Sequence, residues 1–124
     1  MVKRIVVAGC RNFNDYSVVK KYIDMCISDI RKQYTLIFLS GGCRGVDKLG
    51  ERYAKENRFS IEYYPAEWEK YGRAAGPKRN ERMASAADYV ICFWDGKSKG
   101  TASMISYAKA RGIPIKIKKI CPLD

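Results

Sequence analysis

Four short segments of the sequence combine glycine with basic or polar side chains, a combination that suits the binding of an anion. They are Gly9 to Asn12, Ser40 to Asp47, Gly72 to Asn80 and Trp94 to Thr101. Glycine lets a ligand approach the backbone closely, and arginine or lysine adds charge-assisted hydrogen bonds. The four segments therefore indicate a site for a phosphate group.

The residues predicted to bind the ligand all lie in these four segments. The charge should come from Arg11, Arg44, Arg79 and Lys99. The Gly-Gly-x-x-Gly spacing is a weak signal by itself, and no Gly-Lys-Ser/Thr follows it as in a Walker A loop. The predicted ligand-binding set is Gly9, Arg11, Asn12, Gly41, Gly42, Arg44, Gly45, Asp47, Arg79, Asn80, Trp94, Asp95, Gly96, Lys99, Gly100 and Thr101.

Catalysis, if there is any, must proceed without histidine, because the chain contains none. This absence removes the commonest general base near neutral pH. Asp47 and Asp95 are the obvious acids near the predicted site and are the two candidate catalytic residues. Asp47 has an equally good structural interpretation as the cap of the helix that follows it.

Five cysteines are present, at positions 10, 26, 43, 92 and 121. The number is odd, there is no Cys-x-x-Cys motif, and a zinc site would need ligands at a different spacing. We expect reduced thiols in a cytoplasmic protein, with Cys26 and Cys92 in the core. No metal and no cofactor is predicted.

The net charge is +11, from 24 lysines and arginines against 13 acids, and this favours anionic partners. Charge alone does not distinguish a nucleotide from a nucleic acid. No apolar run approaches the roughly 20 residues of a membrane span, so no membrane partner is expected. The length of 124 residues suits one domain, predicted to extend over residues 1–124.

Strands and helices alternate along the chain. Continuous apolar runs predict buried strands, shorter alternating runs predict edge strands, and apolar residues at helical spacing predict helices between them. The first helix, capped by Asp15 or Ser17, carries apolar residues from Val18 to Ile30. The other predicted elements are strands Ile5–Ala8, Leu36–Leu39, Phe59–Tyr64, Tyr89–Trp94 and Ile113–Ile117, and helices Val46–Asn57, Pro77–Ala86 and Thr101–Arg111.

This pattern predicts an α/β fold, a Rossmann-like three-layer sandwich around a five-stranded parallel sheet. The third and fifth strands alternate and should form the edges, which with right-handed crossovers gives the order 3-2-1-4-5. The crevice between strands one and four is then the expected ligand site, at the carboxyl ends of the strands.

Several aromatic and basic residues have competing interpretations. Trp94 is predicted to stack on a base, and the alternative is that it packs against the last helix. Tyr64, Trp68 and Tyr71 are interpreted as core beneath a long connection. Three basic residues are expected to be solvated surface: Arg73, Lys78 and Arg82.

Three motifs in the sequence resemble those of the YspA-like family of the SLOG superfamily. The first runs from Gly41 to Leu49. The second comprises Pro65-Ala66-Glu67-Trp68 and Tyr71 to Asn80 with Met83. The third comprises Ala87 to Phe93 with Lys99-Gly100-Thr101. The superfamily also holds the LOG phosphoribohydrolases and the DprA/Smf proteins.

The resemblance implies a Rossmann-like fold, a nucleotide-derived ligand and a plausible homodimer. LOG enzymes carry a catalytic glutamate where this sequence has Met104, so the resemblance does not imply their hydrolysis. The favoured hypothesis is a sensor or sequestering module for a phosphorylated nucleoside or nucleotide derivative. The alternatives are an N-glycosidic hydrolase using Asp47 or Asp95, and, less favoured, a DprA-like binder of single-stranded DNA.

Overall fold

A parallel five-stranded sheet forms the centre of the molecule. The computed structural model describes residues 1–121. The strands are β1 (Val2–Gly9), β2 (Thr35–Ser40), β3 (Ser60–Tyr63), β4 (Tyr89–Trp94) and β5 (Ile115–Lys119), in the order β3-β2-β1-β4-β5. The predicted fold class and strand order are confirmed.

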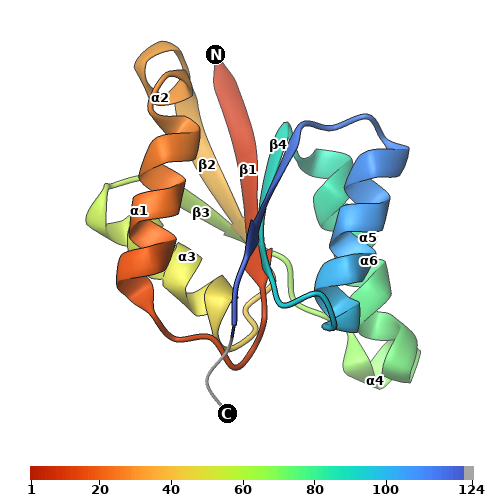
Figure 1. Ribbon diagram of the computed structural model, residues 1–124. Helices are drawn as coiled ribbons and strands as arrows, with labels where there is room; N and C mark the ends of the chain where they lie inside the picture. The colour runs from red at the N-terminus through yellow and green to blue at the C-terminus, as the bar shows by residue number, and fades with distance from the viewer. Residues whose placement is uncertain (122–124) are drawn as a thin grey trace.

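Helices cover both faces of this sheet, as Figure 1 shows. One face carries α1 (Tyr16–Ile27) and α3 (Val46–Glu56), and the short α2 (Ile30–Gln33) follows α1. The other face carries α5 (Ala75–Ala86) and α6 (Lys99–Ala110). Between β3 and α5 the chain forms α4 (Trp68–Tyr71) and a 3-10 turn, Gly72–Ala74. Among residues 1–121, no helix has the length and apolar character needed to cross a membrane.

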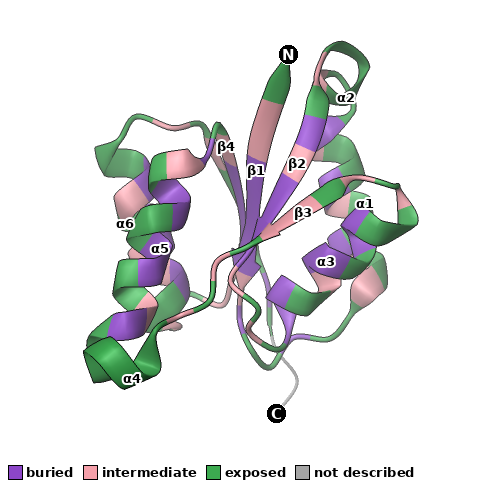
Figure 2. Ribbon diagram, turned by 180° about the vertical axis from the view of Figure 1, so that it is seen from behind, coloured by how far each residue is buried: buried purple, intermediate pink, exposed green. Residues whose placement is uncertain are grey.

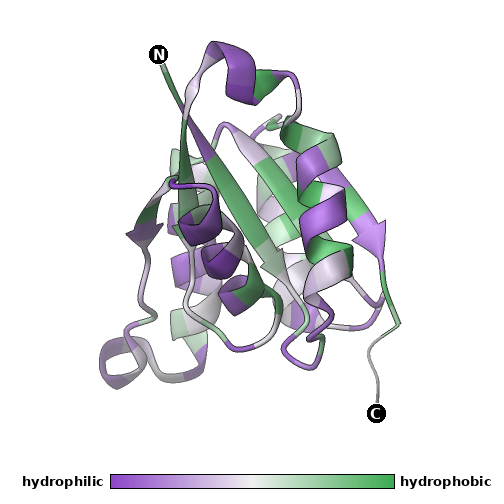
Figure 3. Cartoon of the chain, turned by 90° about the vertical axis from the view of Figure 1, so that its left-hand side faces the viewer, coloured by the Kyte–Doolittle hydropathy of each residue, from purple (hydrophilic) through white to green (hydrophobic). Residues whose placement is uncertain are grey.

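The central strands are apolar on both faces because each face is covered. In β1, Ile5 and Val7 belong to the core beneath α1 and α3, whereas Val6 and Ala8 belong to the core beneath α5 and α6. Figure 2 shows this buried centre, and Figure 3 shows apolar strands flanked by helices with hydrophilic outer faces. Side chains of alternating direction along β1 thus join two apolar layers.

The edge strands carry the polar residues that the alternation predicted. On β5, Lys116 and Lys118 are exposed. On β3, Glu62 pairs with Arg4 of β1, with 3.0 Å between Arg4 Nε and Glu62 Oε1. Charged side chains on edge strands discourage pairing with another sheet.

Element boundaries differ from prediction where the chain bends. The first helical stripe is divided into α1 and α2, although Asp15 caps α1 and accepts a hydrogen bond from Val18 N as expected. Helix α5 begins two residues before Pro77, since proline fits the first turn of a helix without losing a hydrogen bond. Strand β5 begins at Ile115, because the Ile113 N–H is bonded to the end of α6 at Ala108 O.

The connection between β3 and α5 does not bury two of its aromatic residues. Trp68 is 52% exposed and Tyr71 is 37% exposed, so the prediction that they belong to the core is wrong. Tyr64 packs against the core as expected. The short α4 projects away from the sheet, and its ribbon in Figure 2 is exposed throughout.

Candidate functional site

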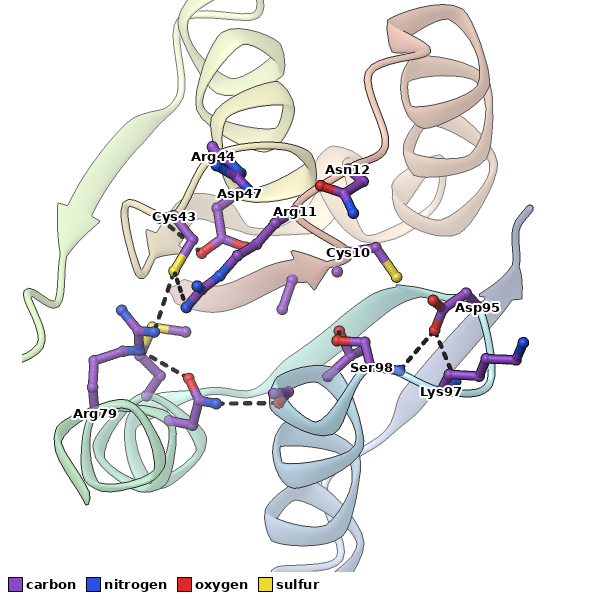
Figure 4. A pocket seen from close by; sticks show the side chains of 16 residues that line it. Cys10, Arg11, Asn12, Cys43, Arg44, Asp47, Arg79, Asp95, Lys97 and Ser98 are labelled. Carbon is purple, nitrogen blue, oxygen red and sulfur yellow. Dashed lines mark hydrogen bonds between the residues drawn. The ribbon is translucent and has the colours of Figure 1, made fainter. Parts of the chain in front are cut away.

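A cavity of about 460 Å³ lies at the carboxyl ends of β1 and β4. It is formed by the loops after β1, β2 and β4, by the middle of α5 and by the first turn of α6, and Figure 4 shows its lining side chains. The lining residues are Ala8, Gly9, Cys10, Arg11, Asn12, Cys43, Arg44, Asp47, Arg79, Asn80, Met83, Asp95, Lys97, Ser98, Gly100 and Thr101.

Gly9 allows the strands and α3 to meet at this edge. It is paired with Phe93 of β4, and a Cβ at this position would lie 2.5 Å from the Phe93 carbonyl oxygen and 2.8 Å from the Val46 side chain. Only glycine fits such a close approach of backbone to backbone. Because Gly9 has no side chain, the crevice between β1 and β4 begins at the carboxyl ends of these two strands.

Gly45 connects the loop after β2 to the loop after β1. Its φ of 78° lies in the region that favours glycine, and a Cβ there would clash with the carbonyl oxygens of Cys10 and Arg11. The next residue, Val46, donates its N–H to Cys10 O at 3.2 Å. The start of α3 is thus held beside the β1 loop.

Asp47 brings a buried carboxyl group to the cavity wall. It is the second residue of α3 and is 6% exposed, and Cys43 N donates to its Oδ2 at 3.4 Å. Burial raises the pKa of this carboxyl to about 6, although the positive charge of Arg79 opposes the rise. Gly45 occupies the cap position, so the helix-capping alternative for Asp47 is wrong.

Arg79 and Asn80 connect α5 to the loop after β2 and to the start of α6. The Arg79 guanidinium donates to Gly41 O at 2.6 Å, to Asn80 Oδ1 at 2.9 Å and to Cys43 Sγ at 3.4 Å. Asn80 Nδ2 in turn donates to Gly100 O at 3.2 Å. Both side chains project from α5 and are buried. They therefore support the loops from behind and also form part of the cavity wall.

The loop after β4 is held by Asp95. Its Oδ1 accepts hydrogen bonds from the N–H groups of Lys97 and Ser98, both at 2.8 Å. These bonds, Ser98 first, hold the pKa of the Asp95 carboxyl below its ordinary value. Asp95 faces the cavity from the side opposite Asp47 (Figure 4).

Two arginines reach the cavity without a carboxylate partner. Arg11 and Arg44 are exposed, and neither forms an ion pair within the part of the chain that the structure describes. Figure 4 shows the Arg11 side chain extended toward Cys43, with 4.0 Å between Arg11 Nη2 and Cys43 Sγ. The cavity therefore carries positive charge available to an anion, and helices α3 and α6 begin at its rim.

Six of the predicted residues do not line this cavity. Gly41 and Gly42 border a smaller adjoining cavity, and Gly45 lies behind the loop. Gly96 and Lys99 are exposed at the surface and do not line the cavity. Trp94 packs against the core on the α6 side and donates its indole N–H to Ser98 O at 3.1 Å, which fits the alternative in which it packs rather than stacks.

Six lining residues were missing from the predicted set. Four of them, Cys10, Cys43, Lys97 and Ser98, lie in the glycine-rich segments and could have been found by taking each segment whole. Burial raises the pKa of the Cys10 thiol. The other two, Ala8 and Met83, are apolar, and nothing in the sequence distinguishes them from other core residues.

Met104, the position where LOG enzymes have a glutamate, is 1% exposed and belongs to the apolar core beneath α6. A carboxylate here would have to be desolvated among apolar side chains. The described part of the chain has no group of three or more side chains that could hold a metal ion.

Residues 3–71 match the pattern of the YspA, cpYpsA-related SLOG family. Similarity extends beyond this range in a phage protein, the Gene 61 protein of Mycobacterium phage D29. It is 32% identical over an alignment of 121 residues, and the match covers 92% of this chain and 94% of the phage protein. The chain belongs to the YspA, cpYpsA-related SLOG family.

Solved structures confirm the fold of this SLOG chain. DNA processing protein A (DprA) from Streptococcus pneumoniae superposes with a TM-score of 0.74 at 17% identity over 99% of the SLOG chain, and the match covers 52% of DprA. The chain thus spans about half the length of DprA. The protein TM1055 superposes with a TM-score of 0.65 at 22% identity, covering 91% of this chain and 72% of TM1055.

Proposed function

We propose that this SLOG chain binds a phosphorylated nucleoside or another nucleotide-derived ligand at the carboxyl edge of its sheet and serves as a sensor or sequestering module. The supporting observation is the pair of exposed arginines, Arg11 and Arg44, on a cavity at whose rim α3 and α6 begin. In this proposal residues 1–124 form one nucleotide-binding domain.

The charged groups at the cavity can supply a large part of the binding free energy of such a ligand. Micromolar binding requires about 8 kcal/mol. Two charge-assisted hydrogen bonds contribute about 1.5–3 kcal/mol each, and a helix N-terminus contributes about 0.3–2 kcal/mol. The remainder, and the cost of immobilising the ligand, must come from contacts with the sugar and base.

Calorimetric titration with nucleosides and their monophosphates tests the proposal. Arg44→Ala should weaken binding of the monophosphate about ten- to 100-fold and leave the bare nucleoside almost unchanged. The control is Arg73→Ala, since Arg73 is also exposed but lines neither cavity. Equal affinity of monophosphate and nucleoside, or no binding of either, would reject the proposal.

Hydrolysis of an N-glycosidic bond is a second candidate, and Asp47 favours it. A cavity-lining carboxyl with a pKa of about 6 is suited to proton transfer near neutral pH. Release of free base from nucleoside monophosphates by the native chain, lost in Asp47→Asn with ligand affinity kept within a few-fold, would establish this activity. Absence of release from the whole panel would leave the binding function alone.

Binding of single-stranded DNA is the other candidate, favoured by the net charge of +11 and the fold shared with DprA. A chain that contacts six to ten phosphates should lose roughly 10³- to 10⁵-fold in affinity between 50 and 200 mM salt. A mononucleotide site should lose much less.

A homodimer stays a prediction, which sedimentation equilibrium would test.

A further inference from the structure

A second cavity, of about 390 Å³, adjoins the first. The two share four wall residues: Arg11, Cys43, Arg44 and Arg79. The two unpaired arginines therefore stand at the junction between the cavities. Each volume alone is near the lower end of the roughly 300–1,000 Å³ that small-molecule sites occupy.

The wall of this second cavity combines one large aromatic side chain with small residues. Trp68 of α4 provides the aromatic ring, and Gly41, Gly42 and Ala66 provide the small residues. A Cβ at Gly42 would meet no atom within 4 Å, so the space beside this backbone is open. An aromatic face beside open backbone suits a planar ring.

Trp68 is unlike the other aromatic residues of the same connection. Tyr64 packs against the core. The Tyr71 ring is covered by Lys70 and Lys78, whose Nζ atoms lie 5.1 and 4.7 Å from its centroid. Within the described residues no cation lies over Trp68, which is 52% exposed.

We infer that Trp68 forms a second subsite and that the ligand class is a dinucleotide, with one nucleoside in the first cavity, its linking pyrophosphate at Arg11 and Arg44, and the second base stacked on Trp68. This inference rests on the proposed function, which it deepens. It assigns a role to the exposed tryptophan and explains why the arginines lie between two cavities rather than inside one.

The test compares dinucleoside pyrophosphates with their mononucleotides by calorimetry, for the bases adenine, guanine, cytosine and uracil. The native chain should bind one dinucleoside pyrophosphate at least about ten-fold more tightly than the corresponding monophosphate, the size expected for one stacked base. Trp68→Ala should remove that gain and leave monophosphate affinity within about two-fold. Trp68→Phe should keep most of it.

Tyr71→Ala is the matched control, because Tyr71 is an exposed aromatic residue of the same helix that does not line this cavity. It should retain the gain. Circular dichroism of each variant confirms that the fold is kept. Tryptophan fluorescence of the native chain should be quenched by the dinucleotide, and Trp68→Phe should abolish most of this quenching.

The outcomes separate the two proposals. If monophosphates bind but no dinucleotide binds more tightly, the proposed function stands and the second subsite is rejected. Equal losses in Trp68→Ala and Tyr71→Ala would also reject the subsite. An oligodeoxynucleotide that binds more tightly than any dinucleotide, with the same dependence on Trp68, would assign the wall to nucleic acid and overturn the inference. If no nucleotide binds, both proposals fail.

Discussion

The two sides of the main cavity treat their acidic residues in opposite ways. On the β2–α3 side, Asp47 is buried, receives one long hydrogen bond from Cys43 N and has a pKa raised to about 6. On the β4–α6 side, Asp95 is only partly buried, accepts two bonds of 2.8 Å from backbone N–H groups and has a lowered pKa. The pKa values of the two aspartates thus shift in opposite directions, because burial removes water from Asp47 whereas Asp95 gains hydrogen-bond donors.

The same contrast holds for the backbone. The β2–α3 loop is held by neighbours at close range: Gly41 by the Arg79 side chain and Gly45 by the carbonyl groups of the β1 loop. Gly100, at the start of α6, has no atom within 4 Å of the position a Cβ would take. One side of the site is constrained by tertiary contacts, whereas the other is organised mainly by its own local hydrogen bonds.

Alanine substitutions at the two glycines should show the largest difference between the sides. Gly45→Ala should destabilise the fold by about 4 kcal/mol or more, because a strained φ is combined with a backbone clash. Gly100→Ala should be neutral or stabilising by up to about 1 kcal/mol, since alanine is the better helix former. Urea unfolding measures both, and similar losses in the two variants would contradict the contrast.

Arg79→Met should be next in size, at about 3–4 kcal/mol. The substitution keeps much of the side-chain volume but leaves Gly41 O without its buried donor and Asp47 without its nearby positive charge. Arg73→Met, at an exposed position, serves as the control and should change the free energy of unfolding little. An Arg79 variant as stable as this control would mean that the scaffold role is wrong.

Asp47 should make stability fall as pH rises. Its carboxyl has a pKa of about 6 in the folded chain and an ordinary value of 3.8, so the folded state holds this proton more tightly than the unfolded state. The stabilisation is complete below pH 4 and is lost by about pH 6, and two pKa units correspond to about 3 kcal/mol. The stability of the native chain minus that of Asp47→Asn should follow this decline.

A difference curve for Asp47 that is flat between pH 4 and 7 would show that burial does not penalise the ionised carboxyl. The asparagine variant keeps an oxygen that can accept from Cys43 N, so the comparison isolates the charge. Above pH 7 the variant should be the more stable protein.

Asp95→Ala should have the smallest effect and the opposite pH dependence. The pKa of this carboxyl is lowered in the folded chain, so its ionised form stabilises the fold above the ordinary value and the contribution is lost as pH falls. The variant should therefore be less stable than the native chain at pH 7 and similar to it in acid. A gain in stability at pH 7 would contradict the local role of the β4–α6 loop.

Much of the fold was predictable because period and burial are local properties of the chain. The runs at Ile5–Ala8 and Tyr89–Trp94 are apolar at every position, and a strand covered on both faces requires this. Apolar and charged residues alternate at Ile115–Lys118, and this alternation marked an edge strand because one face of such a strand meets water. Boundaries were less accurate where a helix could begin early, as at Ala75, because propensity does not settle such ends.

The sequence by itself determined the sheet order, the positive charge at its carboxyl edge and three of the four loops that meet there. The remaining predicted loop, residues 72–80, forms a 3-10 turn and the first residues of α5. Only the tertiary structure decided which of those residues face the cavity. It buried Asp47 and Arg79 in the cavity wall, packed Trp94 against the core and left Trp68 exposed beside a second cavity. Periodicity reports the face of a residue on its own element, whereas desolvation and hydrogen bonding depend on neighbours from distant parts of the chain.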